Sequence, residues 1–314
     1  MKKIIVFCVA FLATMSLWAS ETSVNAIWYD FDSYTKTASV TYKGSYSSED
    51  FNEYTGEVVI PSTVTYGGEE YSVTSIGENA FAYCRSLTSI TIPESVTSIG
   101  SWAFDDCNSL TSIDVASNNN NYTSIDGVLF SKDKTILIRC PEGKATSYTI
   151  PDGVTEIGEG AFWACRDFTS ITIPESVTEI GDVAFVNCRS LRSVTIPSGV
   201  TKIGDGAFYE CTGFTSITCK NTIPPIIMEP EFEGENCTFD GVYKFIPLYV
   251  PAESVEVYNN TKYWREFTNI QAIPSSSVAN ANAETQDSVR KEYRDGQVLI
   301  IKGDKTYTMF GTEY

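Results

Sequence analysis

The sequence predicts a solenoid, which is a stack of short coils that bury their apolar faces against one another. The first observation is a phrase close to IPxSVTxIGxxAFxxCxxLxSIT that recurs with a period of 23 residues. One phenylalanine marks each good copy: Phe81, Phe104, Phe162, Phe185 and Phe208. The second observation is the size of the unit. Because so few residues cannot enclose a core, each copy has to pack on the copies before and after it.

Each copy predicts two short strands and a turn. In Leu87–Ile92, isoleucine alternates with serine and threonine, which is the period of a half-buried strand. Pro93 ends this strand, because proline cannot donate the next ladder hydrogen bond. A second strand is expected over Val96–Ile99. A compact helical or turn segment then carries Phe104 and Cys107 inward.

The gap between Phe104 and Phe162 is 58 residues, longer than the period. Within it, Ile125–Phe130 and Thr135–Ile138 resemble the strands of a degenerate copy of the repeat, with a polar turn between them. We therefore expect a degenerate coil here and not a break. In that case Phe130 joins the other phenylalanines in one continuous buried ladder.

Both ends of the solenoid differ from its repeats. Residues 21–57 are rich in tyrosine and alternate in segments such as Ala38–Tyr42, which predicts a β-hairpin cap. At the other end, a second degenerate copy of the repeat runs from Phe239 to Pro251. Because an exposed last strand invites aggregation, we expect the following apolar residues to close the stack: Val255, Tyr258, Tyr263, Trp264 and Phe267.

A different composition begins after the solenoid. Residues 274–287 are rich in Ser, Ala and Asn and predict a flexible linker. In the last segment, 288–314, Gln297–Ile301 and Thr306–Phe310 predict a β-hairpin. This tail resembles the short C-terminal β segments of exported proteins from the Bacteroidetes. The resemblance implies a sorting or attachment signal.

The five good copies also carry a family resemblance. They read IPSTV…VTSIGENAFAYCRSL, IPESVTSIGSWAFDDCNSL, IPDGVTEIGEGAFWACRDF, IPESVTEIGDVAFVNCRSL and IPSGVTKIGDGAFYECTGF. Over residues 58–273 the chain resembles the leucine-rich repeats of BspA-like bacterial surface proteins. The resemblance implies a curved, right-handed leucine-rich repeat solenoid and a binding or adhesion role at the cell surface. It carries over no catalytic residue, because the shared motif is structural.

The N-terminus predicts export. Residues 1–20 have a charged start at Lys2 and Lys3, an apolar stretch over Ile4–Trp18 and a small-residue end, which together indicate a secretory signal peptide. A membrane anchor is the alternative, although the apolar stretch is short and polar sequence follows it. We expect a mature protein without a transmembrane span, either extracellular or at the cell surface in association with the outer membrane.

Composition argues against several chemistries. The net charge of −18 disfavours nucleic acid, whose phosphates need clustered Lys and Arg. The absence of histidine excludes Ser-His-Asp and Cys-His nucleophiles and His-based zinc sites. We expect no enzyme, cofactor or metal. Carboxylate pairs for sugar hydrolysis stay open, although solvated loop acids are the simpler interpretation of the many candidates: Asp105, Asp106, Glu156, Glu159, Glu179 and Asp182.

The cysteines follow the repeat. Five of them occupy one repeat position: Cys84, Cys107, Cys165, Cys188 and Cys211. Because their spacing is that of the coils and not that of a metal or disulfide plan, we predict buried free thiols. Oxidation of neighbouring pairs in an exported protein is the alternative, and the pairing of Cys140, Cys219 and Cys237 stays open.

A binding site is expected where the repeats differ. The strand face is a monotonous ladder of Ser and Thr, which suits solvation, with a sugar- or peptide-binding groove as the alternative. Variation concentrates around the Phe and Cys positions. Since aromatic residues and arginine are enriched at binding hot spots, the candidate partner-binding residues are Tyr83, Trp102, Trp163, Arg166, Arg189 and Tyr209.

The predicted partner of this surface is a protein, from a host matrix or from a bacterial surface. A glycan-binding or glycan-cleaving accessory protein is the alternative function. Packing of the six candidate side chains against adjacent coils is the alternative role for the residues themselves.

Overall fold

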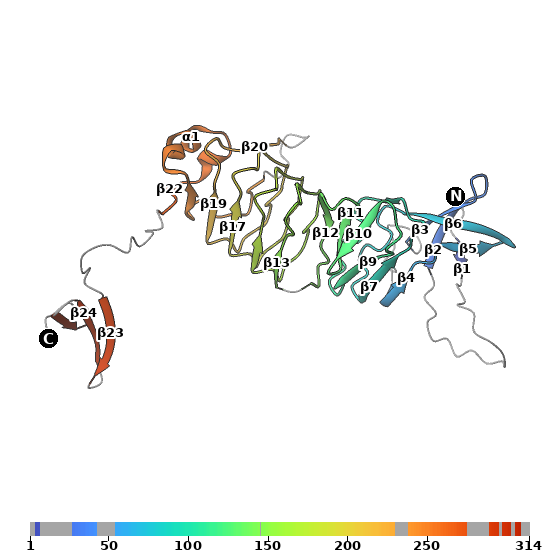
Figure 1. Cartoon of the computed structure of the whole chain (residues 1–314), viewed down its shortest axis with the longest axis horizontal. Coiled ribbons are helices and arrows are strands. Elements are labelled where there is room, and N and C mark those ends of the chain that lie inside the picture. The colour runs from blue at the N-terminus through green and yellow to red at the C-terminus, as the bar shows by residue number, and fades with distance from the viewer. Residues whose placement is uncertain are drawn as a thin grey trace. The chain divides into compact units, whose positions relative to one another are not determined.

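The computed structural model describes residues 4–6, 27–42, 54–144, 146–229, 238–274, 289–294, 297–302 and 305–308. The chain divides into two compact units, Met1–Ile273 and Pro274–Tyr314. The first unit is a solenoid of stacked coils (Figure 1).

Parallel ladders run along the solenoid, and coil follows coil in the register that the repeat predicts. Glu156 pairs with Glu179, and Glu179 pairs with Lys202, so equivalent residues of successive coils lie side by side. The first ladder joins β12 (Ile136–Arg139), β14 (Glu156–Ile157), β16 (Glu179–Ile180), β18 (Lys202–Ile203) and β20 (Ile226–Ile227).

The first strands of the repeats, most of which are followed by a proline, form the other face of the coils. Near the N-terminus they are β4 (Gly56–Val59), β7 (Leu87–Ile92) and β9 (Ser112–Val115), and further on β13 (Ser147–Thr149) pairs with β15 (Ser170–Thr172). The last group is β17 (Ser193–Ile196), β19 (Ser216–Cys219), β21 (Leu248–Val250) and β22 (Ile270–Ala272). In β17, Val194 and Ile196 are buried while Ser193 and Thr195 are exposed, as the alternation predicts.

The segment that carries each phenylalanine is a turn and not a helix. Two residues of each turn have left-handed backbone conformations, for example Trp102 at φ 56° and Asp106 at φ 49°. Such conformations interrupt a right-handed helix. Between them Phe104 points inward and is 4% exposed.

The predicted phenylalanine ladder exists in two parts. Phe81 stacks on Phe104 with ring centroids 5.8 Å apart, and Phe162 stacks on Phe185 at 5.0 Å. The second part continues through Phe208 to Phe239, at 5.2 and 5.6 Å. All the predicted rings are buried, Phe130 included.

Phe130 does not belong to the stack, and the prediction of one continuous ladder is wrong at this point. It lies on β11 (Val128–Ser131), the middle strand of an antiparallel meander between β10 (Tyr122–Ile125) and β12. Only β12 rejoins the parallel ladder, through β14. The buried residues accordingly form two clusters, with Leu129 in one and Phe130 in the other. The backbone is continuous but the core is divided.

An antiparallel cap precedes the first coil. Strands β2 (Ile27–Asp32) and β3 (Thr37–Thr41) form the predicted hairpin, and β3 pairs in parallel with β6 (Glu69–Ile76). Strand β6 also pairs with β5 (Thr63–Tyr66) and with β8 (Ser98–Ile99). Strand β1 (Ile4–Val6) pairs with β2. The rest of residues 1–20 lies outside the described residues, and the signal peptide stays a prediction.

The far end is closed by aromatic side chains. The segment contains η1 (Ala252–Ser254), α1 (Val255–Asn260) and η2 (Trp264–Glu266). Trp264 is fully buried and its indole N–H donates to the carbonyl of Pro225 at 3.1 Å. Tyr258 is fully buried and its hydroxyl donates to the carbonyl of Asn221 at 3.0 Å. Phe267 is buried as predicted, whereas Val255 and Tyr263 pack only partly against the core.

The second unit contains a three-stranded antiparallel sheet of β23 (Val289–Arg294), β24 (Gln297–Lys302) and β25 (Lys305–Thr308). The predicted hairpin corresponds to β24 and β25. Strand β23 was not expected, because its run of charged residues has no apolar alternation. Residues 275–287 of the predicted linker lie outside the described residues.

The repeated cysteines are buried, and their thiols have a defined partner. The Sγ of Cys107 donates to the carbonyl of Phe81 at 3.1 Å, one coil earlier, and Cys188 donates to Phe162 in the same way at 3.2 Å. Burial raises the pKa of the Cys107 and Cys188 thiols well above the usual value. The cysteine therefore acts as a small apolar residue that also satisfies an inward carbonyl. Cys237 lies outside the described residues.

The stack predicts a large loss of stability when one ring is removed from it. Phe185 contacts a ring on either side, so Phe185→Ala should lower the free energy of unfolding by about 3–5 kcal/mol. Urea titration measures this loss. Phe245→Ala, at a ring that is 67% exposed, is the control and should change stability by about 0.5 kcal/mol or less. Similar losses in both variants would contradict the buried stack.

Thiol burial predicts a two-stage labelling result. Cys107, Cys165, Cys188 and Cys211 are buried as free thiols, so a maleimide should label them only after denaturation. Mass spectrometry of the native and the unfolded protein counts the labels. Rapid labelling of the native protein, or a disulfide between neighbouring coils, would overturn the prediction.

Candidate functional site

The six candidate residues lie on the turn face of the solenoid but do not form one cluster. Tyr83 is 39% exposed and belongs to the coil before Trp102. Trp102, Trp163 and Arg166 lie on the two coils that flank the meander. Arg189 and Tyr209 belong to later coils, where Arg189 forms an ion pair with Glu210 at 3.6 Å. The structure therefore selects the middle of the solenoid, where two of the candidates touch.

Trp102 and Trp163 contact each other edge to face, with ring centroids 4.8 Å apart and an interplanar angle of 68°. Both side chains are half-buried. They are 61 residues apart in sequence and come together because the intervening chain forms the meander and only a short turn. We call these two residues the Trp pair.

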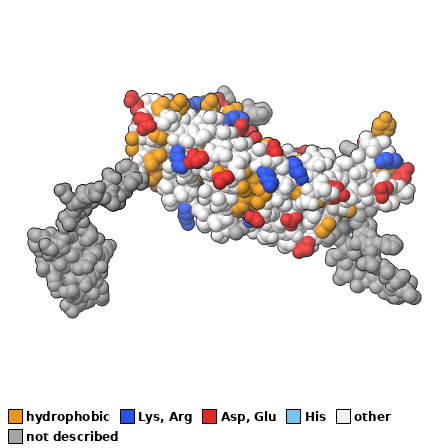
Figure 2. Space-filling view, viewed as in Figure 1, with side chains coloured by type: hydrophobic (Ala, Val, Ile, Leu, Met, Phe, Trp, Pro, Cys, Tyr) orange, Lys and Arg blue, Asp and Glu red, His pale blue; other side chains and the backbone are white. Residues whose placement is uncertain are grey.

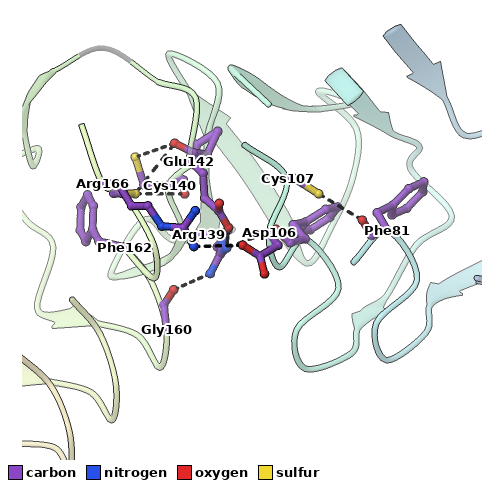
Figure 3. A network of polar contacts seen from close by, with 12 residues as sticks. Phe81, Asp106, Cys107, Arg139, Cys140, Glu142, Gly160, Phe162 and Arg166 are labelled. Atoms are coloured by element: carbon purple, nitrogen blue, oxygen red, sulfur yellow. Dashed lines mark hydrogen bonds and ion pairs between the residues drawn. The ribbon is translucent and has the colours of Figure 1, made fainter. Parts of the chain in front are cut away.

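The turn between the two tryptophans is built on a buried arginine. Arg139 donates through Nη1 to the carbonyl of Gly160 at 2.8 Å and through Nη2 to the carbonyl of Phe104 at 3.2 Å (Figure 3). In regular coils, a cysteine thiol of the next coil donates to the corresponding phenylalanine carbonyl. The degenerate coil has no cysteine at that position, and Arg139 donates to the Phe104 carbonyl in its place.

Cys140 falls outside the 23-residue period of the other cysteines because it occupies a different position in its coil. Its backbone N–H donates to the carbonyl of Ala161 at 2.7 Å, as Phe162 donates to Ala184 in the next coil. Cys140 therefore occupies the phenylalanine position of the degenerate coil. In agreement, the thiol of Cys165 approaches the Cys140 carbonyl at 3.9 Å.

Glu142 completes the buried polar network. Its Oε1 lies 2.9 Å from Nη2 of Arg139, and its side chain is 2% exposed. Its Oε2 has no hydrogen-bond partner. Burial raises the pKa of the Glu142 carboxyl to about 8, and the nearby Arg139 offsets this only in part.

Two aspartates extend the network towards the surface. Asp106 accepts from Nη2 of Arg166 at 3.2 Å, a contact between the coils on either side of the degenerate turn. Asp105 lies next to it with its Oδ1 enclosed and unpartnered. Burial raises the pKa of the Asp105 carboxyl, against the influence of Arg139.

Two hollows adjoin the Trp pair. One, of about 220 Å³, is lined by Trp102, Tyr122, Arg139 and Glu159 among others. The other, of about 780 Å³, is lined by both tryptophans and by residues of the N-terminal cap and the first turn, among them Asp30, Glu78 and Asp105. Trp102 therefore borders both the small hollow over the degenerate turn and the larger one that reaches the cap, while Trp163 borders the larger one.

The backbone at Trp102 is unusual for so large a residue. Its φ of 56° is left-handed, and the equivalent residues of the other coils, Asn79, Gly160, Val183 and Gly206, also have positive φ. A left-handed conformation costs about 1 kcal/mol or more for a residue with a Cβ. Val183 at the same position of another coil and the candidate Tyr83 also have a positive φ, so this conformation belongs to the turn, and Trp102 is distinguished by its contact with Trp163.

Sequence reasoning named Trp102, Trp163 and Arg166 as candidates but did not predict that the two rings touch, and it missed the buried Arg139 and Glu142 beneath them. Arg139 had a detectable signal, because a charge interrupts the apolar run Ile136–Cys140. Glu142 had none. Asp30 and Glu78 come from the cap and the first turn, and only the fold brings them towards Trp102.

Charge on the solenoid is mixed. On the face drawn in Figure 2, acidic side chains are scattered along the coils among fewer basic ones, without a continuous basic surface. Within the described ranges, the side chains form no group of three or more acidic, histidine or cysteine residues that could hold a metal ion. Nor does the described part of the chain contain a helix long and apolar enough to cross a membrane.

The stacked coils, with parallel strands in a 23-residue register and an inward Phe and Cys in each turn, define a leucine-rich repeat scaffold. The family model of the BspA-type leucine-rich repeat region matches residues 58–143 and 140–238, in six copies. These ranges cover more than half of the chain. The chain therefore belongs to the BspA-type leucine-rich repeat family, as its motifs predicted.

Solved structures of bacterial repeat proteins are similar in sequence. A leucine-rich repeat protein of Eubacterium ventriosum is 28% identical over 63% of this chain and 51% of its own, with a TM-score of 0.49. A leucine-rich cell surface protein of Faecalibacterium prausnitzii is 26% identical over 77% and 73% of the two chains, with a TM-score of 0.41. The chain thus spans about half the length of the first. No curated protein matches the chain.

The raised pKa of Glu142 predicts a pH dependence of stability. The folded protein retains a proton that the unfolded chain releases above its ordinary pKa of 4.5. The stability that the folded protein gains from this retained proton is therefore complete below about pH 4.5 and is lost as the pH rises through about 8. Urea titrations at pH 5, 6.5 and 8.5 should show a smaller loss of stability in Glu142→Gln than in the wild type.

The exposed Glu159 of the next coil provides the control for this series. Glu159→Gln should keep the wild-type pH dependence, because its carboxylate remains in water. Equal pH dependence in the wild type and in Glu142→Gln would contradict the protonated, buried state.

Proposed function

We propose that this chain is an exported binding protein that recognises another protein through the turn face around the Trp pair. The observation that carries the proposal is the contact between two half-buried tryptophans from non-adjacent coils, beside two hollows. Tryptophan is enriched among the residues that dominate binding energy.

The location of the protein follows from a separate line of argument. The N-terminal pattern of charge, apolar stretch and small residues supports export. Membership of the BspA-type family supports a place at the bacterial surface. Under this proposal the solenoid is displayed outside the cell, where it contacts a host matrix protein or a protein of another bacterium.

Binding without catalysis is part of the same proposal. The repeats use their recurrent positions for packing, and the chain has no histidine to act as acid or base. The buried Glu142 is held by Arg139 under the Trp pair, where it supports the turn. A scaffold of this kind offers shape and side chains to a partner.

A binding screen tests the proposal. The folded full chain is presented to a panel of matrix proteins, bacterial surface proteins and glycans, and the same panel is repeated with a Trp102→Gly, Trp163→Val double variant. Glycine and valine occupy the same repeat positions in other coils, as Gly206 and Val186. We expect a protein ligand, bound at least tenfold more weakly by the double variant.

Two controls accompany the screen. Tyr243→Ala removes an aromatic side chain that is 57% exposed on a later coil, and it should bind as the wild type does. Urea titration checks that the double variant is folded. Ligand binding that survives the double variant would refute the proposed surface, and a glycan as sole ligand would replace the protein partner. Turnover of a polysaccharide or peptide that a single carboxylate change abolishes would overturn binding without catalysis.

A further inference from the structure

We propose that the larger hollow beside the Trp pair accepts a cationic side chain, an arginine or lysine, from the protein partner. This inference rests on the proposed function and names the chemistry that the partner presents there. The hollow lies between the N-terminal cap and the turn face, and its volume of about 780 Å³ is ample for a long side chain and its neighbours.

The hollow combines aromatic faces with carboxylates. Trp102 and Trp163 line one part of it, and Asp30, Glu78 and Asp105 line the rest together with neutral polar groups. Asp30 comes from strand β2, Glu78 from the first turn, Trp102 and Asp105 from the second turn, and Trp163 from the turn that follows the meander. Among the described residues that line it there is no Lys or Arg. The lining is therefore acidic as well as aromatic.

Two of these carboxylates have an unused acceptor. The Oδ1 atoms of Asp30 and Asp105 are enclosed by protein and have no hydrogen-bond partner. Enclosed polar atoms are normally paired, because the lost hydration is otherwise not replaced. The two enclosed Oδ1 atoms are out of reach of a ligand, but a guanidinium or ammonium group in the hollow would lie beside these carboxylates and bring the compensating positive charge.

The neighbouring arginines are already engaged. Arg166 forms an ion pair with the carboxylate of Asp106. Arg139 is held by Glu142 and by two carbonyls beneath the Trp pair. Their charge lowers the net negative potential near Asp105, but the hydrogen bonds that they form go to Asp106, Glu142 and two carbonyls. Asp30 and Glu78 are not ion-paired in the described structure, so the cap side of the hollow keeps its negative charge.

The aromatic component selects for the same kind of ligand. A cation over the face of tryptophan is attracted by the ring quadrupole, and arginine also stacks on indole. A neutral glycan could use the aromatic faces but would leave the carboxylate charge uncompensated. The net charge of −18 also attracts basic surfaces during encounter. Aromatic faces and carboxylates together therefore favour a basic side chain.

A matched pair of peptides tests the charge requirement. The probes are a seven-residue peptide, Gly-Gly-Arg-Gly-Arg-Gly-Gly, and the same peptide with citrulline, which keeps the shape of arginine and lacks its charge. Tryptophan fluorescence of the full chain reports binding next to Trp102 and Trp163. We expect the arginine peptide to bind at least tenfold more tightly than the citrulline peptide, and more weakly at high salt.

Variants then locate the site. Trp102→Gly removes one ring and relieves the left-handed strain, and it should weaken arginine-peptide binding at least tenfold. Asp30→Asn and Glu78→Gln together should have a similar effect with little change of shape. Glu253→Gln, at an exposed carboxylate of the C-terminal cap, is the charge control and should bind as the wild type does. Isothermal calorimetry measures the variants in which a fluorescent ring is lost.

The outcomes separate this inference from the proposed function. Equal binding of the two peptides, no binding of either, or wild-type affinity in the Asp30 and Glu78 double variant would overturn the cationic site. If a protein ligand from the screen depends on Trp102 but not on these carboxylates, the proposed function stands and the inference fails. If the arginine peptide binds as expected but the protein ligand ignores Trp102, the inference stands and the proposed function fails. Preference for a neutral glycan in the same hollow would refute both.

Discussion

The structure depends on hydrogen bonding between coils. Phe162 donates its backbone N–H to Ala184 at 2.7 Å, and Phe185 donates to Ala207 at the same distance one coil later. Because every coil leaves donors and acceptors for its neighbour, no coil is satisfied alone, and stability is a sum of nearest-neighbour contacts. The aromatic cap around Trp264 and the antiparallel cap around β2 and β3 are consequences of the same requirement, since both ends must be closed.

The same requirement explains the unusual chemistry in the middle of the solenoid. Where the turn of the degenerate coil is short, a guanidinium supplies donors to Phe104 and Gly160. The same guanidinium donates to the buried carboxyl of Glu142 at 2.9 Å. The Trp pair then lies over this contact between Arg139 and Glu142. A defect in the repeat has thus placed polar groups, aromatic rings and hollows at one point of an otherwise uniform surface.

Much of the fold, and less of the site, could be predicted from the sequence. The 23-residue period placed Phe162, Phe185 and Phe208 in one stack, because identical coils repeat identical contacts. Phe130 was misplaced because a hairpin strand and a solenoid strand have the same alternation, and only the turn at Asp126 and Gly127, both with positive φ, distinguishes them. The contacts of Trp102 with Trp163 and of Arg139 with Phe104 join distant segments, which no local pattern encodes.

The left-handed turn positions relate packing to function. Each regular turn has a positive φ at the residue two before its phenylalanine, which favours glycine or asparagine, as at Gly160, Gly206 and Asn79, although Val183 adopts it as well. The core gains nothing from a tryptophan at this position, because the side chain is half-buried on the turn face. Stability alone would therefore select against Trp102. Trp102 lies where the repeat is interrupted and contacts Trp163 there, and under the proposed function this position serves contact with a partner.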